Sequence, residues 1–494
     1  MPEAARANDA WSRWIPLLSA LATAGWVWGV TSFHGPGLDS DSAQYLAAAQ
    51  SLSQGQGWLG VDGQPYQLWP PLYPALLAAL TRCGVELLDA VRVLHSLSAA
   101  LTIWACAHVT RAVLDSRAVA IAVSLLLPFV VARTATMAWS EPVFVALCAC
   151  AAVAWERWNA ARTPGAWWSL LALSAAIPAQ RYVGVVWVAC IASALILTER
   201  GQVEWSVRLR RTALYCACSA LPVLAWFARN AWSTQHLDGR RGPPSDDWRG
   251  DALSALREAL PLPSNESVWA WVSGALALVC IALGLVRLAR DRAVRWRAWP
   301  MIVFPFCFAA SLVGLRQAVE FDPIDERLMS PAMPFMTVLA VAGAFSLASA
   351  SRVLSLALLA LWALLDAAPR SISRLEHQWQ QARTHGPGIY ESPDWAASPL
   401  VAFVREHRDG VETYSNEPFA LSLLASQATT PLPARPGKMP KLFERWRDEP
   451  RRRRVVLFRF NPRIQIDWGA YREALDARQV ASFADGEVWE LGPR

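Results

Sequence analysis

Long apolar runs recur along most of this chain, and they constrain its fold more than any other feature. A helix needs about 20 consecutive apolar residues to cross the hydrocarbon core of a bilayer. Only 17% of the residues are charged, against about 25% in an average soluble domain. We therefore expect a mainly α-helical, polytopic membrane protein of about eleven transmembrane helices. The predicted spans are 14–33, 91–112, 117–134, 141–158, 164–180, 183–200, 208–228, 267–288, 299–316, 328–349 and 351–368.

One further apolar run, residues 71–80, is too short to cross a bilayer. It follows Pro70, and we expect an interfacial or re-entrant helix inside a long first external loop, 34–90. With this run left out of the spans, the arginine-rich short loops all fall on one side, which the positive-inside rule makes cytoplasmic. These loops carry Arg111 and Arg117; Arg157 and Arg162; Arg200, Arg208, Arg210 and Arg211; and Arg287, Arg290, Arg292, Arg295 and Arg297. The sequence thus predicts an inner (plasma) membrane protein with a cytoplasmic N-terminus and an extracytoplasmic C-terminus.

The chain divides into a transmembrane domain, 1–368, and a small extracytoplasmic α/β domain, 369–494. In the second domain we expect strands at 411–415 and 455–460, helices at 417–426 and 471–478, and a hairpin of 480–483 with 488–491 around Asp485-Gly486. A run of four arginines, 451–454, has two interpretations. It forms a solvent-exposed face, which we favour, or it contacts anionic lipid headgroups.

The first external loop carries the first candidates for chemistry. Asp39 and Asp41 follow the first span, and Tyr45 lies one helical turn after Asp41, on the same face. Asp41 has two interpretations that one residue can combine: the N-cap of a helix, with Gln44 completing a capping box, or a general base. The motif GxGxxG at 55–60 follows a helical pattern rather than a strand, so we expect turns there and no dinucleotide site.

Further ionisable residues lie at the predicted outer ends of the spans. Burying an ionisable side chain in a membrane costs free energy unless the side chain snorkels to the interface, pairs with another charge or lines a water-filled cavity. Their number on one side predicts a cavity with carboxylates for acid–base work and guanidiniums for an anion. The candidates are Arg92, Glu141, Arg181 with Tyr182, Arg316, and the segment Asp325, Glu326 and Arg327.

Other ligand classes receive little support from the sequence. The nine cysteines form no CxxC pair and have no His at metal spacing, so no cofactor is implied; a divalent metal is compatible with the site but not required. The basic residues form no stripe interleaved with aromatics, which argues against nucleic acid as a partner.

Several motifs, in order, resemble those of integral-membrane glycosyltransferases of the GT-C superfold. The similarity is to the bacterial protein O-mannosyltransferase and aminoarabinose-transferase-like branch (glycosyltransferase family 39-like). The motifs are D-S-A-Q-Y at 41–45, A-x-x-L-x-x-G-x-G at 49–57, P-P-L-Y-P at 70–74, Arg92, W-S-E-P at 139–142, Arg181-Tyr182, R-L-x-x-P at 327–331 and Tyr414-Ser415-Asn416. Members of this branch often have Asp-Glu where this chain has Asp41-Ser42, so the resemblance leaves Asp39 and Asp41 as alternative catalytic aspartates. The spacing to Tyr45 favours Asp41.

The resemblance implies transfer of a sugar from a polyprenyl-phosphate donor to the hydroxyl of a glycan, lipid or protein acceptor, with inversion, outside the cytoplasm. It implies catalytic roles for Asp41, Asp39 and Glu141 and donor-phosphate contacts for Arg181, Arg327, Arg92 and Tyr182. It also implies substrate contacts for Tyr45, Tyr73 and Asn416. Two alternatives stay open: a transporter or flippase, and a non-catalytic scaffold of envelope polysaccharide assembly.

Overall fold

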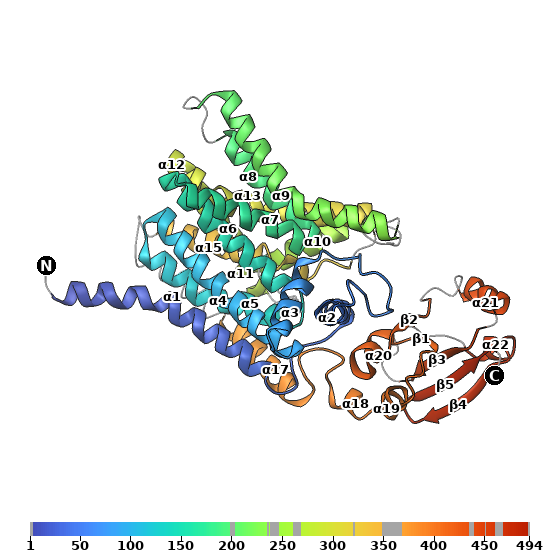
Figure 1. Ribbon diagram of the computed structural model, residues 1–494. Helices are drawn as coiled ribbons and strands as arrows, with labels where there is room; N and C mark the ends of the chain where they lie inside the picture. The colour runs from blue at the N-terminus through green and yellow to red at the C-terminus, as the bar shows by residue number, and fades with distance from the viewer. Residues whose placement is uncertain are drawn as a thin grey trace. The chain divides into compact units, whose positions relative to one another are not determined.

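The structure is a computed structural model. It describes residues 3–197, 203–234, 237, 247–259, 268–319, 322–347, 368–433, 439–449, 451–459 and 468–492. The described chain is mostly helical and has one small sheet near its C-terminal end (Figure 1). It forms two compact units. The helical unit comprises 1–30, 67–73 and 92–380, and the loop–tail unit comprises 31–66, 74–91 and 381–494.

The helical unit contains most of the apolar sequence. Its helices are α1 (Glu3–Val30), most of α4 (Leu87–Leu114), α5 (Arg117–Ala135), α6 (Glu141–Ala161), α7 (Pro164–Gln180), η1 (Tyr182–Gly184), α8 (Val185–Leu197), α9 (Trp205–Thr234), α10 (Trp248–Ala259), α11 (Val268–Arg290), α12 (Arg292–Arg297), α13 (Trp299–Ala318), α14 (Glu326–Met329), α15 (Met333–Leu347) and most of α17 (Ala368–Thr384). The boundary predicted between 368 and 369 falls inside α17.

Among the described residues, five helices are long and apolar enough to cross a membrane: α4, α5, α6, α9 and α13. Three shorter apolar segments are Trp14–Val30, Tyr182–Leu197 and Met333–Ser346. The predicted span at 351–368 lies almost wholly outside the described residues, so the count of eleven stays a prediction. The short apolar run forms α3 (Leu72–Arg82), whose 11 residues are too few to span.

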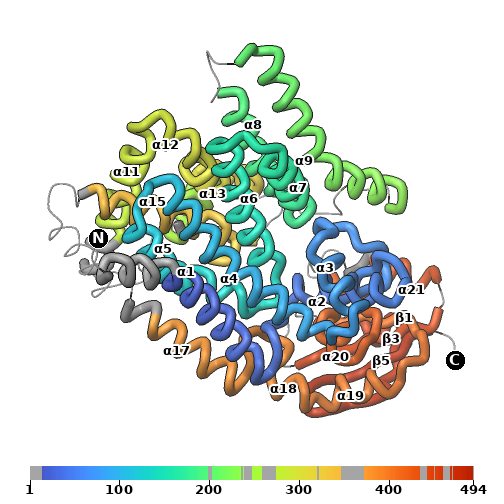
Figure 2. Tube along the Cα trace, turned by 60° about the vertical axis from the view of Figure 1, so that its left-hand side comes forward, coloured from blue at the N-terminus to red at the C-terminus, as the bar shows by residue number. Residues whose placement is uncertain are grey.

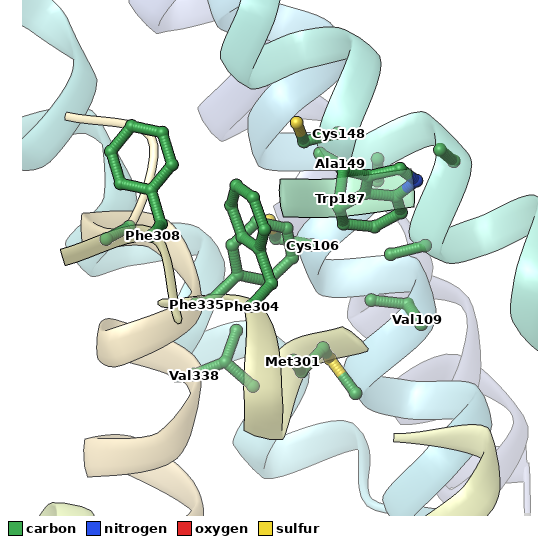
Figure 3. Packing of buried hydrophobic residues seen from close by; sticks show 14 of the residues in the cluster. Cys106, Val109, Cys148, Ala149, Trp187, Met301, Phe304, Phe308, Phe335 and Val338 are labelled. Atoms are coloured by element: carbon green, nitrogen blue, oxygen red, sulfur yellow. The ribbon is translucent and has the colours of Figure 1, made fainter. Parts of the chain in front are cut away.

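Aromatic side chains fill the centre of the helical unit (Figure 3). Trp187 of α8 meets Phe304 of α13 edge to face, with ring centroids 5.3 Å apart. Phe304 in turn meets Phe335 of α15 in the same geometry at 5.6 Å. Edge-to-face contacts between buried rings stabilise a core beyond the area that they bury. This packing ties α8, α13 and α15 together.

The loop–tail unit is built on a five-stranded sheet with the order β2-β1-β3-β5-β4 (Figure 1). β1 (Glu412–Ser415) pairs in parallel with β2 (Thr429–Pro431) and β3 (Arg453–Phe458), and β5 (Gly486–Leu491) pairs antiparallel with β3 and β4 (Arg478–Phe483). Its helices are α2 (Ser40–Ser53), most of α3, α18 (Pro393–Ala396), α19 (Pro399–Glu406), α20 (Pro418–Ala425), α21 (Met439–Asp448) and α22 (Gly469–Arg472).

The structure has the predicted strands, the hairpin and the helix near 417–426. The helix predicted at 471–478 is wrong in extent, because α22 ends at Arg472 and β4 begins at Arg478.

Both interpretations of the arginine run are wrong for two of its members. Arg453 and Arg454 lie in β3 and are only 2% and 3% exposed. Arg453 pairs with Glu412 at 3.2 Å, and Arg454 pairs with Glu490 at 3.1 Å. Buried charges persist when they are paired in this way. These arginines therefore hold the sheet together from inside.

The first loop and the tail share one unit because their backbones and helices meet. Val61 O accepts a hydrogen bond from Thr429 N of β2 at 3.1 Å, and α2 packs against α20, which Figure 2 shows side by side. After α2, Gly55 and Gly57 take positive φ angles of 77° and 90°. This is the turn geometry that favours glycine, so the glycine-rich motif forms turns, as predicted.

Candidate active site

The central feature of the helical unit is a buried carboxylate held by two arginines. Glu141 is 0% exposed, and its Oε1 lies 2.6 Å from Nη1 of Arg181 and 2.6 Å from Nε of Arg327. The two arginine side chains are 14% and 11% exposed. Charge-assisted bonds in such a dry environment are stronger than in water. Three of the predicted site residues, from α6, the α7–η1 junction and α14, thus form one cluster.

Local sequence explains why Glu141 opens α6. Ser140 is the N-cap residue and Pro142 occupies the first turn, where its missing N–H costs nothing. A carboxylate in the first turn also interacts favourably with the helix dipole. Gln180 donates to the carbonyl of Ser140 at 2.9 Å, which joins the start of α6 to the end of α7.

Each arginine of the cluster has a second support. Arg181 is the residue where α7 gives way to η1; its backbone is extended, and its Nη1 donates to Ser140 Oγ at 3.0 Å. Arg327 lies in α14, which Asp325 caps by accepting from Leu328 N at 2.9 Å. The Arg327 guanidinium stacks over the Trp139 ring at 4.6 Å. Two planar cations are therefore held close together, an arrangement suited to an anion.

Tyr182 joins the first loop to α9. Its hydroxyl donates to Gln67 O at 3.3 Å and accepts from Trp226 Nε1 at 3.1 Å. Its ring lies 5.1 Å from that of Phe227, and Asn230 also donates to Gln67 O, at 3.4 Å. Tyr182 is the residue after Arg181 of the cluster. Its contacts therefore anchor the segment 67–73 of the first loop within the helical unit.

The other predicted charges make separate contacts. Arg92 lies over the Trp28 ring at 4.0 Å, on α1. Arg316 pairs with Asp251 of α10 at 2.6 Å. Glu326 pairs with Arg133 at 2.6 Å, in an exposed bridge. The Arg316–Asp251 pair is also buried, with side chains 14% and 9% exposed, and it shares no residue with the Glu141 cluster.

His95 is a buried polar residue that the sequence patterns did not single out. It is 1% exposed, and its Nε2 lies 2.8 Å from the hydroxyl of Tyr73, itself 0% exposed. Its Nδ1 lies 3.1 Å from Ala135 O. A carbonyl only accepts, so Nδ1 carries the proton and Nε2 accepts from Tyr73. The tyrosine of the PPLYP motif thereby holds the end of α5, a few residues before Glu141, and its role as a substrate contact stays a prediction.

In the loop–tail unit, Asp39 and not Asp41 is the N-cap of α2. Asp39 Oδ1 accepts from Ser42 N and Ser42 Oγ, both at 3.0 Å. Asp41 lies in the first turn, partly exposed, and Tyr45 is 1% exposed on the same helix. The capping interpretation of Asp41 is therefore wrong: the helix begins at Ser40, so the cap falls on the residue before it.

Asn416 makes a reciprocal pair with the backbone of β3. Its Nδ2 donates to Phe458 O at 2.9 Å, and its Oδ1 accepts from Phe458 N at 2.9 Å. The amide therefore extends the pairing of β1 with β3 past the last strand residue. Contact with substrate stays a prediction for Asn416.

Among the described residues, no group of three or more His, Cys, Asp or Glu side chains could hold a metal ion. A groove between α4, α6 and α7 is lined by Trp104, Glu156 and Arg157. It lies toward the opposite end of α6 from Glu141, and we give it no catalytic role because it contains none of the clustered residues.

No protein-family model matches the sequence, and no curated protein matches it. Solved structures do. ArnT from Cupriavidus metallidurans bound to undecaprenyl phosphate is 14% identical, with a TM-score of 0.60 over 96% of this chain and 98% of that one. The apo form of the same protein gives 0.61 over 99% and 100%, at 13% identity. The chain therefore has a GT-C-like fold.

A second group of similar structures comes from an archaeal oligosaccharyltransferase. AglB from Archaeoglobus fulgidus, in complex with an inhibitory peptide and a dolichol-phosphate, is 13% identical. Its TM-score is 0.55, over 91% of this chain and 70% of that one. At these identities the likeness concerns the fold alone.

Proposed function

We propose that this protein is a glycosyltransferase of the plasma membrane that uses a polyprenyl-phosphate-linked sugar as donor. The acceptor is a hydroxyl on a glycan, a lipid or a protein, on the extracytoplasmic side. The observation that carries the proposal is the full-length likeness to an ArnT structure crystallised with undecaprenyl phosphate. AglB, solved in complex with an inhibitory peptide and a dolichol-phosphate, extends the same association to a second group of structures.

The Glu141 cluster is our candidate for the donor phosphate site. Arg181 and Arg327 are held side by side by one carboxylate. A guanidinium has five N–H donors. The bonds from Arg181 to Glu141 and to Ser140 both start at its Nη1 atom. Glu141 keeps the two cations together in the absence of donor, and so serves as a positioning residue. Arg92 and Tyr182 are proposed as further donor contacts.

The proposed reaction is a single displacement at the anomeric carbon. Asp41 accepts the proton of the acceptor hydroxyl as its oxygen forms a bond to the anomeric carbon. The bond between that carbon and the phosphate oxygen breaks, and its electron pair leaves with the polyprenyl phosphate. Arg181 and Arg327 stabilise the negative charge that develops on this leaving group. Attack from the opposite face inverts the anomeric configuration.

The structure supplies a matched pair of variants for testing the base. Asparagine caps a helix about as well as aspartate, so Asp39→Asn keeps the N-cap of α2 and serves as the control. Asp41→Asn should lower sugar transfer by about 10²–10⁴-fold, measured in proteoliposomes with lipid-linked sugars extracted from cells that lack the protein. Arg181→Ala and Arg327→Ala should instead weaken binding of undecaprenyl phosphate. Normal transfer by both Asp→Asn variants would refute the assignment of the base.

The proposed orientation is tested separately by fusions to a reporter that is active only outside the cytoplasm. A fusion after Arg494 should be active, and a fusion at Arg292, in the arginine-rich α12 segment, should be silent. The opposite pattern would place the tail in the cytoplasm and contradict both the span count and an external reaction.

A further inference from the structure

Both backbone groups of Leu38 bond to the tail. Leu38 N donates to Glu391 Oε2 at 3.0 Å, and Leu38 O accepts from Ile389 N at 2.9 Å and from Tyr390 N at 3.3 Å. The other carboxylate oxygen of Glu391 accepts from Gly388 N. One side chain thus receives N–H groups from the first loop and from the tail, and joins the two segments.

Two glycines allow the tail to approach this closely. A Cβ atom on Gly388 would lie 2.4 Å from Leu38 N and 2.8 Å from Leu38 O. Gly386 has a φ of 89°, and a Cβ there would lie 2.3 Å from Glu391 Cγ. Contacts below 3.0 Å force the neighbour to move. The segment 386–391 is therefore shaped to lie against Leu38.

Leu38 is followed directly by the aspartates of the proposed reaction. Asp39 caps α2, and Asp41 lies in the first turn of that helix. A second contact starts from the same tail segment: Tyr390 OH donates to Glu417 Oε2 at 3.0 Å. Glu417 precedes α20, which packs along α2. The tail thus contacts the first loop at Leu38, directly before Asp39, and again along α2.

We propose that Glu391 is a positioning residue that places the segment Asp39–Asp41 for the reaction. This inference rests on the proposed function, because it gives the tail a part in catalysis that involves no contact with substrate.

The ionisation of Glu391 sets the conditions for testing this role. Burial raises the pKa of Glu391 to about 7; the N–H groups of Gly388 and Leu38 oppose this rise, and the charge of Asp39 adds to it. The carboxylate is therefore largely ionised at pH 8, where both of its oxygens are acceptors. In Glu391→Gln, one of these acceptors becomes an NH₂ group that faces an N–H donor.

The first experiment measures amide hydrogen exchange at pH 8 in the full-length protein, in lipid nanodiscs without substrate. In Glu391→Gln, peptides covering 36–44 and 386–392 should exchange about tenfold faster, since a bond to a charged acceptor is lost. The control is Glu406→Gln, which removes the same charge from an exposed position on α19. Unchanged exchange in Glu391→Gln would refute the contact between loop and tail.

The second experiment separates positioning from a purely structural role. With lipid-linked sugars extracted from cells that lack the protein, kcat of Glu391→Gln should fall by about 10- to 100-fold, while binding of undecaprenyl phosphate stays unchanged. Gly388→Ala, whose Cβ would lie 2.4 Å from Leu38 N and 2.9 Å from Glu391 Oε1, keeps the charge of Glu391 and should do the same. Faster exchange with normal kcat would overturn the positioning role. Absence of transfer by the wild-type protein would instead refute the proposed function.

Discussion

Replacing Glu141 with glutamine tests the idea that one buried carboxylate holds the arginine cluster together. The substitution keeps the shape of the side chain and removes its charge. Arg181 and Arg327, only 14% and 11% exposed, would then lose the charged carboxylate that both of them contact. We expect the variant to fold and to be markedly less stable than the wild type.

The magnitude follows from the burial of the pair. Removing one partner of a buried ion pair costs about 3–5 kcal/mol, because the remaining charge is left without compensation in a dry environment. The chain provides a matched control in the bridge between Glu326 and Arg133, where the side chains are 27% and 59% exposed. Exposed pairs contribute about 0–1 kcal/mol. Glu141→Gln should therefore lower the free energy of unfolding several-fold more than Glu326→Gln.

The assay is unfolding of the full-length protein in one detergent, with a double-mutant cycle added. In the double variant of Glu141→Gln with Arg181→Gln, one of the uncompensated cations is gone, so its cost should be less than the sum of the two single costs. Equal costs for Glu141→Gln and Glu326→Gln, or additive costs in the cycle, would refute the view that Glu141 is the common counter-ion.

Three further predictions concern buried polar groups. Tyr73→Phe leaves His95 Nε2 buried without its donor and should cost about 1–3 kcal/mol; a neutral effect on the unfolding midpoint would contradict the tautomer assigned above. Because the pKa of Glu391 is raised to about 7 in the folded state, its stabilising contribution is complete below its ordinary pKa and is lost as pH rises through 7. The unfolding free energy of the wild type should therefore fall relative to Glu391→Gln by about 3 kcal/mol between pH 4 and pH 9, and parallel pH profiles would argue against this. Arg454→Met, at a side chain 4% exposed, should cost about 3–5 kcal/mol; Arg452→Met, at one 51% exposed, should cost under about 1 kcal/mol, and similar losses would refute the internal role of Arg454.

Much of the fold could be predicted because its signals are local. Helix-length apolar runs need no knowledge of their neighbours, and a hairpin around Asp485-Gly486 shows in the turn residues alone. β2 escaped prediction because it has three residues and ends in proline at the sheet edge. β3 begins two residues earlier than expected, at Arg453, because its arginines are neutralised by carboxylates distant in sequence. No local pattern contains those partners.

The candidate site shows the same division between local and distant information. The sequence singled out Glu141, Arg181 and Arg327 as costly ionisable residues, and the structure joins these three in one cluster. From the sequence alone these three residues could not be distinguished from Arg316, because Asp251, the partner of Arg316, lies on another helix. His95 escaped notice because a lone histidine in an apolar run has no pattern of its own.

The assignment of the helix cap has a consequence for the two aspartates. Asp39 uses an oxygen to accept two bonds from Ser42, so its carboxylate is engaged in starting α2. A proton acceptor in catalysis needs an oxygen that is available to the acceptor hydroxyl. Asp41 lies in the first turn of α2, outside the cap. The preference for Asp41 as the proposed base therefore rests on its spacing to Tyr45, and the paired Asp→Asn variants are the test of it.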